Sequence, residues 1–482
     1  MKQKGLEIFF KFWNNYFIFS LVLILILIKV SYLQIPFYWD EAWSYAMAIF
    51  DMANHGPTLI PGHANEWFTR GHPLFFYFIA SSWLVIFGKS VVSAHIFALL
   101  ISCLSLYLIH FCCRKLFSVS IANIVAITLM SQIMFIAQST LLLPEIFLMG
   151  LSVWVFYLYF QKKWIAFMAV SFCLILSKET ALVLFGVLLF DVAILQKLIY
   201  KKEFTNNLTF VKELVFVLVP FLFFGIFLGI QKINLGYFFY PEHTNMMTFS
   251  SVELIKKIQH ISERLFISDM RWVWLLVAVP ALFFGIIKRK YTKNEVHIFA
   301  LSGIFIVSYL LFSSLNFFTI RYLLTMLPFI FLLFIVFIYR SFPNKIGYLL
   351  MAVAIVGNLF YGIFKNKGEG DCVRTFYETV LAHKEAVNFC ESQQWQNKTI
   401  STGFLMNFNL KFPQLGYLNN AENPFANCGN SDAPDIYIFY SNEPNPKIDD
   451  IRIDVDYTLI KRIEKPNGCY VEIYESPQIC AD

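Results

Sequence analysis

Residues 13–41 read WNNYFIFSLVLILILIKVSYLQIPFYWDE, an apolar run that ends in two acidic side chains. Crossing the hydrocarbon core of a bilayer takes about 20 apolar residues, and the part from Trp13 to Leu33 supplies them. Three lysines precede it, and no small-residue cleavage site of a signal peptide follows it. The stretch therefore predicts a retained first membrane span with Asp40 and Glu41 just beyond its end.

The composition of the whole chain also indicates a membrane protein. Of its 482 residues, 58% are apolar and only 15% are charged, whereas about 25% of residues are charged in soluble domains. The basic residues are scattered between apolar runs rather than clustered as in nucleic-acid-binding proteins. This composition excludes a soluble enzyme and a disordered chain, and it argues against nucleic acid as a partner.

Ten more apolar runs follow the first one. They lie near residues 91–111, 119–138, 146–160, 164–177, 180–195, 213–230, 272–287, 296–314, 322–339 and 346–364. All the runs together predict a polytopic α-helical membrane protein with about eleven transmembrane helices. A further stretch, Pro73–Phe87, has 15 residues and would reach only about 22 Å as a helix, short of the ~30 Å hydrocarbon core. We expect it to lie in the membrane interface, within the first outer loop.

The basic residues orient these spans, because cytoplasmic loops are enriched in Lys and Arg. With Pro73–Phe87 lying flat, the inner loops hold 17 Lys and Arg and the outer loops hold 9, although the outer loops are longer. If that stretch crossed the membrane, the basic clusters at 201–202 and 288–290 would face outward. The N-terminus is therefore predicted to be cytoplasmic, and an odd number of spans places the C-terminal end outside.

Residues 365–482 form a second, acidic part of the chain, with 11 Lys and Arg against 17 Asp and Glu. Their pattern predicts a helix over 371–396, strands over 398–404, 435–441 and 457–463, and a hairpin around 465–468. We expect a transmembrane domain over 1–364 and an extracytoplasmic α/β domain over 365–482. Acceptor binding and structural support are both open as roles of the second domain.

Five of the nine cysteines lie in this acidic part. They are Cys372, Cys390, Cys428, Cys469 and Cys480. An oxidising outer compartment allows one or two disulfides among them, and the sequence does not pair them. The other four, Cys103, Cys112, Cys113 and Cys173, are expected to be packing residues of the membrane helices.

Ionisable side chains gather at the outer ends of the predicted spans. Charged groups are costly inside a membrane and are functional candidates there, but the span centres are nearly free of them. Four further ionisable residues lie toward span ends: Lys29, His95, His110 and Asp191. Snorkelling or a hydrogen bond explains them there, so we assign them no catalytic or binding role. The outer band contains Asp40, Glu41, Glu66, Arg70, His72, Glu145, Lys178, Glu179, Glu242, His243 and Arg321. We expect a functional site in that band.

The first outer loop contributes the acidic pair Asp40–Glu41, which opens an aromatic, amphipathic segment suited to the interface. Asp40 would act as a general base at the membrane surface, and Tyr38 and Trp39 before it would contact substrate. The alternative is that Asp40 caps a helix whose positive end Glu41 favours.

Further along, NEWFTRGHPLFFY at residues 65–77 supplies Arg70 and His72. Arg suits bidentate recognition of a phosphate, whereas a lone surface Arg can also anchor to lipid headgroups.

The acidic pair after the first span and the Gly-His-Pro-Leu-aromatic segment resemble the GT-C glycosyltransferases of the protein O-mannosyltransferase and lipid A aminoarabinose transferase type. The resemblance continues along residues 13–340. LLLPEIF places Glu145 at the outer end of the third span, ILSKET places Lys178 at that of the fifth, and TIRYLLTMLP places Arg321 before the tenth. Similar positions in that family are acidic, Lys and Arg-Tyr.

The resemblance implies an inverting transfer of a sugar from a polyprenyl-phosphate carrier to a hydroxyl acceptor, a glycan, glycolipid or protein, at the outer face. Asp40 would be the catalytic base, with Glu41 and Glu145 as further catalytic carboxylates. The phosphate of the leaving lipid needs fixed cations, for which Arg70, His72, Lys178 and Arg321 are the candidates. The alternatives are that Glu145 caps its span, that Lys178 snorkels and that Arg321 anchors its span.

The chain departs from these relatives in two places. Aminoarabinose transferases have a Lys before a Pro pair in the first loop, whereas this chain reads Arg70-Gly71-His72-Pro73, so an aminosugar donor is not supported. The 231–271 segment is short, as in a smaller bacterial relative, and either covers the site or lies on lipid. Its Glu242 and His243 are expected to bind substrate; they could also ligate a divalent metal, but two residues do not make a metal site, so none is assigned.

The rival function from another class is a lipid or solute transporter or flippase. It predicts polar residues at mid-membrane and broken helices in two matching halves, and the sequence has neither. A membrane-anchored assembly or sensor protein is a third alternative. With the short outer loop and no endoplasmic-reticulum retention ending, the expected location is the bacterial inner membrane, with the C-terminal domain in the periplasm.

Overall fold

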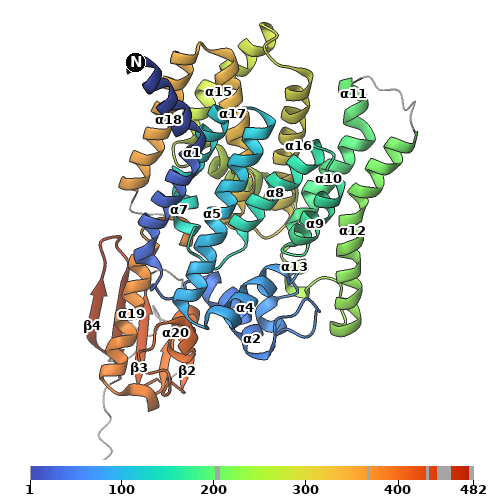
Figure 1. Cartoon of the computed structure of the whole chain (residues 1–482). Coiled ribbons are helices and arrows are strands. Elements are labelled where there is room, and N and C mark those ends of the chain that lie inside the picture. Colours follow the sequence, from blue (N-terminus) through green and yellow to red (C-terminus); the bar gives the residue numbers. More distant parts are fainter. Residues whose placement is uncertain (1, 201–206, 366–369, 430–433, 442–456, 477–482) are drawn as a thin grey trace, which may run out of the picture.

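The computed structural model describes residues 2–200, 207–365, 370–429, 434–441 and 457–476. It is a bundle of long helices with a small sheet at one end (Figure 1). The helices of the bundle are α1 (Lys2–Lys29), α5 (Val91–Leu116), α6 (Val119–Met130), α7 (Ile133–Gln138), α8 (Glu145–Phe160), α9 (Trp164–Ile175), α10 (Leu182–Phe190), α11 (Gln196–Tyr200), α12 (Asn207–Leu235), α15 (Arg271–Ile287), α16 (Lys293–Leu315), α17 (Leu327–Ser341) and α18 (Asn344–Phe364).

Every apolar run predicted to span the membrane falls on one or two of these helices. Five described helical segments are long and apolar enough to cross a membrane, or six if the bent pair formed by 251–267 and 271–287 is one span. The body is therefore that of a multi-pass membrane protein, and the number eleven stays a prediction. In α5, 61% of the most apolar stretch is buried, against 22% in α12, so α5 is central and α12 is peripheral.

Local chemistry sets several helix ends and bends. The Ser90 and Ser118 side chains accept the backbone N–H groups of Ser93 and Ile121 and so cap α5 and α6. Thr292 and Glu295 form a reciprocal capping box at the start of α16. Pro280 lies inside α15, where it removes a backbone hydrogen bond.

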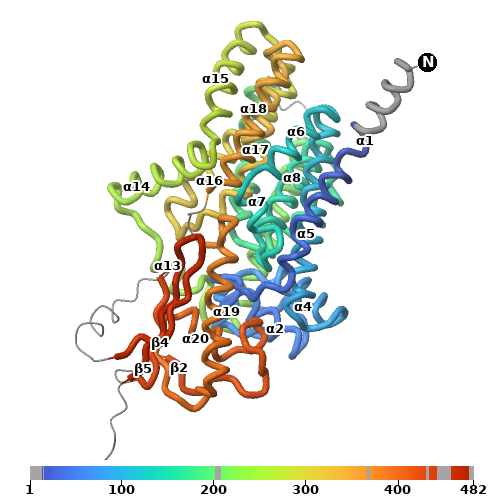
Figure 2. The backbone as a smooth tube through the Cα atoms, turned by 90° about the vertical axis from the view of Figure 1, so that its left-hand side faces the viewer, coloured from blue at the N-terminus to red at the C-terminus, as the bar shows by residue number. Residues whose placement is uncertain are grey.

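Five short helices surround one end of the bundle. They are α2 (Met47–His55), α3 (Glu66–Thr69), α4 (Phe75–Phe87), α13 (Pro241–Asn245) and α14 (Ser251–Ser262). The segment predicted to lie in the interface forms α4, which packs against α2 and α5. Figure 2 shows α14 running across the direction of the bundle helices, and the chain bends by 84° between its segment and α15.

The C-terminal domain is a mixed sheet with two helices. Its elements are α19 (Phe376–Ser392), β1 (Ile400–Thr402), α20 (Phe404–Lys411), β2 (Cys428–Gly429), β3 (Ile436–Tyr440), β4 (Thr458–Glu464) and β5 (Tyr470–Glu475). The strand order is β2-β1-β3-β5-β4, with β1 parallel to β2 and β3, and β5 antiparallel to β3 and β4. The predicted helix, the three predicted strands and the β4–β5 hairpin are all confirmed.

The turn around Gly416 makes one of the contacts that fix this domain to the bundle. The Phe37 N–H donates to the Leu415 carbonyl over 3.1 Å, and the Tyr417 hydroxyl donates to the Phe37 carbonyl over 3.0 Å. Between them Gly416 has φ +88°, and a Cβ there would lie 3.0 Å from Val91. A side chain at position 416 would therefore be strained and crowded.

The described cysteines of the C-terminal domain form none of the disulfides that the sequence allowed. Cys372, Cys390, Cys428 and Cys469 are free thiols, and Cys480 lies outside the described residues. Three of the four are buried in the packed interior of the C-terminal domain, where cysteine acts as a small apolar residue. An oxidising compartment allows disulfides but does not require them, and none is formed among these four described cysteines.

Candidate functional site

Arg321 joins three carboxylates from distant parts of the chain. It lies in the 3-10 turn Ile320–Thr325 before α17 and is only 3% exposed. Its guanidinium donates to Asp40, and it lies 3.4 Å from both the Glu145 and the Asp371 carboxylate. The first outer loop, the start of α8 and the beginning of the C-terminal domain therefore meet at one side chain.

Lys178 is the second cation of this group. Its Nζ lies 2.8 Å from the same Glu145 oxygen that Arg321 contacts and 4.0 Å from the centre of the Tyr322 ring. Burial disfavours the charge on Lys178, but Glu145, Tyr322 and Glu179 together outweigh burial and raise the pKa of the ammonium group. Glu145 is fixed by both cations, while its second oxygen has no hydrogen-bond partner among the described residues.

Asp40 is the carboxylate of this group that a substrate can reach. Its side chain is 21% exposed, whereas those of Glu145 and Asp371 are 1% and 4% exposed. Burial works to raise the pKa of Asp40, but Arg321, Trp43 and Lys178 together outweigh it and hold that pKa below its usual value. Trp43 donates from its indole Nε1 to the second Asp40 oxygen over 3.0 Å.

The backbone around Asp40 is unusual. Trp39 has φ +53°, a left-handed conformation that is rare and costly for a large side chain. A π-helical turn, Glu41–Ala46, follows Asp40 directly, and such turns are frequent at functional sites. The two irregularities place Asp40 toward Arg321, Glu41 toward the interior and Trp43 beside Asp40.

Glu41 has a different position from the one expected of a catalytic residue. It is fully buried, and one oxygen accepts the Leu142 backbone N–H over 2.6 Å and contacts His95 Nε2 at 3.0 Å. The other oxygen accepts the Tyr38 N–H over 3.4 Å. Because protein groups occupy both oxygens, we assign Glu41 the positioning of the first loop in place of direct chemistry.

Asp371 was not among the residues selected from the sequence. It lies in the short turn Gly370–Cys372 after the last helix of the bundle, and Gln138 donates to its backbone carbonyl over 3.0 Å. Burial raises the pKa of Asp371, and Asp40 adds to this although Arg321 opposes it. The signal that could have found it is its position: an acidic residue just outside the last span, like those of the outer band.

A second group of side chains lies next to the first. Arg70 has φ +50°, stacks on the Trp43 ring at 4.4 Å and makes a 2.6 Å ion pair with Glu242. The 231–271 segment therefore reaches the site through α13, and Trp43 connects Arg70 to Asp40. A Cβ at Gly71 would lie 3.0 Å from Tyr240, so a larger residue would push α13 away.

His72 and His243 complete this second group. His72 Nδ1 lies 3.1 Å from Glu179 Oε2, and the rings of His72 and His243 are 4.8 Å apart. Burial, with His72 as the next cause, lowers the pKa of His243 to about 4. Glu179 was recognised as part of the outer band but not chosen as a site residue. Among the described residues no three His, Cys, Asp or Glu side chains form a group that could hold a metal ion.

Tyr38 and Trp39, the two aromatic residues before Asp40, were expected to contact substrate, and Tyr38 faces the C-terminal domain. Tyr38 is 4% exposed, stacks on Phe376 at 6.0 Å and lies 6.4 Å from the His383 ring. This burial places Tyr38 in the contact between the two domains and away from an open substrate site. Trp39 is half-buried, and its ring lies 6.2 Å from that of Tyr38.

Polar side chains at other helix ends of the bundle are paired, as the sequence led us to expect. Asp191 accepts from the Tyr159 hydroxyl over 2.5 Å and contacts His297 Nε2 at 2.5 Å. His110 contacts the Asn123 side chain at 2.8 Å. These groups satisfy one another.

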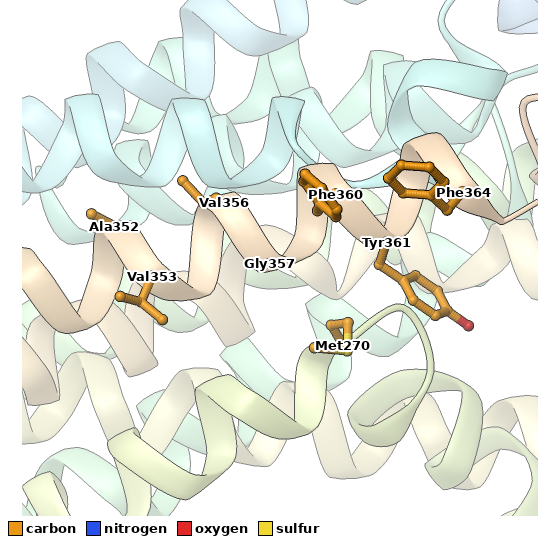
Figure 3. A pocket seen from close by; sticks show the side chains of 8 residues that line it. All are labelled: Met270, Ala352, Val353, Val356, Gly357, Phe360, Tyr361 and Phe364. Carbon is orange, nitrogen blue, oxygen red and sulfur yellow. The ribbon is translucent and has the colours of Figure 1, made fainter.

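An apolar groove of about 760 Å³ lies along α18. Figure 3 shows Val353, Phe360, Tyr361 and Phe364 on one side and Met270, at the start of α15, on the other. The end of α18 and the turn that carries Asp371 both contact α7. The groove therefore ends at the same face of the bundle as the Arg321 group.

Comparisons with known proteins support the fold. No family model and no curated protein matches the chain. Among solved structures, ArnT from Cupriavidus metallidurans in the apo state matches with a TM-score of 0.58 and 12% identity, over 94% of this chain and 97% of that one. The same protein bound to undecaprenyl phosphate matches with a TM-score of 0.58 and 12% identity, over 95% and 97% of the two chains.

An oligosaccharyltransferase from Archaeoglobus fulgidus has a TM-score of 0.44 and 12% identity, over 87% of this chain and 61% of that one. The likeness to ArnT extends over nearly the whole length of both chains, including the C-terminal domain. At this level of identity it establishes the fold. The chain therefore has the GT-C fold, as found in the lipid A aminoarabinose transferase ArnT.

Proposed function

We propose that this protein is an inverting glycosyltransferase that moves a sugar from a polyprenyl-phosphate carrier to a hydroxyl acceptor. The observation that carries the proposal is the Arg321 group: two buried cations and one accessible carboxylate at the outer end of a GT-C fold. One relative with this fold was solved bound to undecaprenyl phosphate, which supports a lipid phosphate as part of the donor. We further propose a bacterial inner membrane location with the C-terminal domain outside.

In this proposal Lys178 and Arg321 hold the donor phosphate. A leaving lipid phosphate carries negative charge that fixed cations stabilise, and such stabilisation is strongest where water is excluded. Both cations are now paired with carboxylates, so the phosphate competes with Asp40 for Arg321. Donor binding would then remove the main interaction that lowers the pKa of Asp40. Asp40 would become a better base when the donor is in place.

The transfer itself is a single displacement. The acceptor oxygen forms a bond to the anomeric carbon of the sugar while the bond from that carbon to the phosphate oxygen breaks. The acceptor proton passes to the exposed Asp40 carboxylate, and the bonding electrons leave with the polyprenyl phosphate. Glu145, fixed by Lys178 and Arg321, keeps both cations in position for the leaving group.

Arg70 and His72 receive a revised role within this proposal. Both are paired with carboxylates. Arg70 pairs with Glu242, which lies in α13, and His72 pairs with Glu179 and lies near α13. We propose that they first hold the 231–271 segment over the site. Contact of Arg70 with the donor phosphate then requires opening of its ion pair with Glu242.

We assign the prenyl chain of the donor to the apolar groove of α18, because this groove ends near the turn of Asp371. Val353 lines it and is 58% exposed, so Val353→Trp should fill the groove and weaken binding of undecaprenyl phosphate. Leu349→Trp is the matched control, since Leu349 is 64% exposed on the same helix and does not line the groove. Equal donor affinity in both variants would place the chain elsewhere.

The proposed function is tested with the purified full chain in liposomes. The donor is a labelled undecaprenyl-phosphate sugar, and the acceptor is the glycan and glycolipid fraction of the producing cell's envelope. We expect label in the acceptor, release of undecaprenyl phosphate in equal amount and inversion at the anomeric carbon. Movement of the lipid across the bilayer without transfer would reject the proposal in favour of a transporter.

A further inference from the structure

We propose that the C-terminal domain completes the acceptor site, with Phe404 as a platform on which an acceptor sugar ring stacks beside Trp43. This inference rests on the proposed function, because it names the acceptor as a carbohydrate. Phe404 is the first residue of α20 and is 46% exposed. Its ring lies edge-on to that of Trp43, with 5.3 Å between the ring centres.

Phe404 is linked to Asp40, the proposed base, through Trp43. Trp43 donates to Asp40 over 3.0 Å on one side and contacts Phe404 on the other. A sugar ring placed against Phe404 and Trp43 therefore has its hydroxyl groups next to the proposed base. The Arg70 guanidinium, stacked on Trp43 at 4.4 Å, supplies hydrogen-bond donors at the edge of this surface.

The aromatic surface extends beyond Phe404. Phe408 and Phe412 follow at intervals of one helical turn, with ring centres 5.0 Å and 5.1 Å apart along the series. Phe404 and Phe408 share one side of α20, Phe412 is the residue that ends the helix, and the buried Leu410 lies on the opposite side.

This combination fits a carbohydrate better than a lipid or a peptide. A pyranose ring has an apolar C–H face and a polar rim, which match aromatic rings bordered by the charged Arg70 and Asp40 side chains. A single exposed aromatic residue is common on protein surfaces and would mean little alone. Here the exposed ring contacts Trp43, the hydrogen-bond partner of the proposed base, and it belongs to the same domain as Asp371, which pairs with Arg321.

The docking of the domain keeps α20 in place. The Gln414 side chain lies 3.3 Å from the Met47 sulfur, and the turn around Gly416 packs on the outer end of α5. Phe404 is therefore presented to Trp43 by a fixed contact between the domains. That gives the C-terminal domain a role in acceptor binding, which the sequence left open beside structural support.

Photo-crosslinking tests the proposal. The full chain is produced in its own host with p-benzoylphenylalanine in place of Phe404, irradiated in membranes and analysed by mass spectrometry. Leu459 is the matched control, because it is also 46% exposed and lies in the same domain on β4. We expect sugar-containing adducts at position 404 and none at 459. A peptide or bare lipid adduct at 404, or none, would overturn the proposal.

Kinetics give a second readout. Phe404→Ala should raise the acceptor KM about tenfold, the effect of losing roughly one aromatic contact, with kcat nearly unchanged; Phe404→Tyr should restore it. Undecaprenyl phosphate binding should be equal in wild type, Phe404→Ala and Leu459→Ala. An unchanged KM in Phe404→Ala would overturn the platform while leaving the glycosyltransferase in place, whereas a wild type without donor binding or transfer would reject the proposed function instead.

Discussion

Replacing Arg321 by Gln separates the structural role of this side chain from its proposed role in donor binding. At the 3.4 Å that separates Arg321 from Glu145 and from Asp371, opposite charges attract by roughly 5 kcal/mol at an effective dielectric constant of about 20. Desolvation offsets much of this. Because the variant leaves the buried Asp371 carboxylate without its cation, while Glu145 keeps Lys178, we expect it to lose about 3–5 kcal/mol of unfolding free energy.

A double variant resolves the ambiguity between misfolding and lost binding. Arg321→Gln with Asp371→Asn has one buried carboxylate fewer, so it should regain about 1–3 kcal/mol of stability over the single variant. It should still fail to bind undecaprenyl phosphate, since the cation is absent. Thermal unfolding and lipid binding are measured in the same detergent. A double variant that folds and binds the donor as well as wild type would refute the assignment of Arg321 to the phosphate.

Four further variants test other parts of the site. Lys178→Met should lower turnover about 10²-fold or more by removing a cation from the leaving group; an initial rate within threefold of wild type would contradict this. Glu41→Gln and His95→Phe should each lower the melting temperature but leave the rate per folded protein nearly unchanged, and a selective loss of rate in Glu41→Gln would restore its catalytic role. The unfolding free energy of wild type should fall relative to Asp371→Asn as pH rises above about 4.

The sign of that pH effect follows from the raised pKa of Asp371. A carboxyl group whose pKa is higher in the folded protein stabilises it while protonated, and this contribution is lost as pH rises through the folded pKa. A difference between wild type and Asp371→Asn that stays constant with pH would mean that Arg321 fully compensates the charge of Asp371. Chemical unfolding at several pH values measures it.

Sequence patterns predicted most of the fold because each element carries its own signal. Apolar runs located the helices of the bundle, and the alternation around Ile436–Tyr440 and the Asn467-Gly468 turn located a strand and a hairpin of the sheet. Whether the allowed disulfides form could not be predicted, because pairing depends on three-dimensional distance and not on the number of cysteines. The number of spans depends on a membrane boundary that helix ends alone do not define.

The site was predicted in part. Asp40, Glu145, Lys178 and Arg321 come together as the shared outer band indicated. The sequence does not show whether a carboxylate faces the substrate or the protein interior. Asp40 and Glu41 are adjacent in sequence, but the π-helical turn that starts at Glu41 points the two side chains in different directions.

Contacts between distant segments could not be predicted from the sequence either. Asp371 and Phe404 belong to the C-terminal domain, and they reach the first outer loop only through the docking of the two domains. No local pattern records such a contact.

The proposed transfer mechanism depends most on Asp40 as the base beside a donor phosphate held by Arg321. The direct measurement is transfer from a labelled undecaprenyl-phosphate sugar by Asp40→Asn, with undecaprenyl phosphate binding measured on the same sample. Asp51→Asn is the matched control, as Asp51 is an aspartate of the same loop with a 28% exposed side chain. We predict that Asp40→Asn binds the donor lipid at least as well as wild type and transfers no sugar, while Asp51→Asn does both. Full transfer by Asp40→Asn would contradict the account.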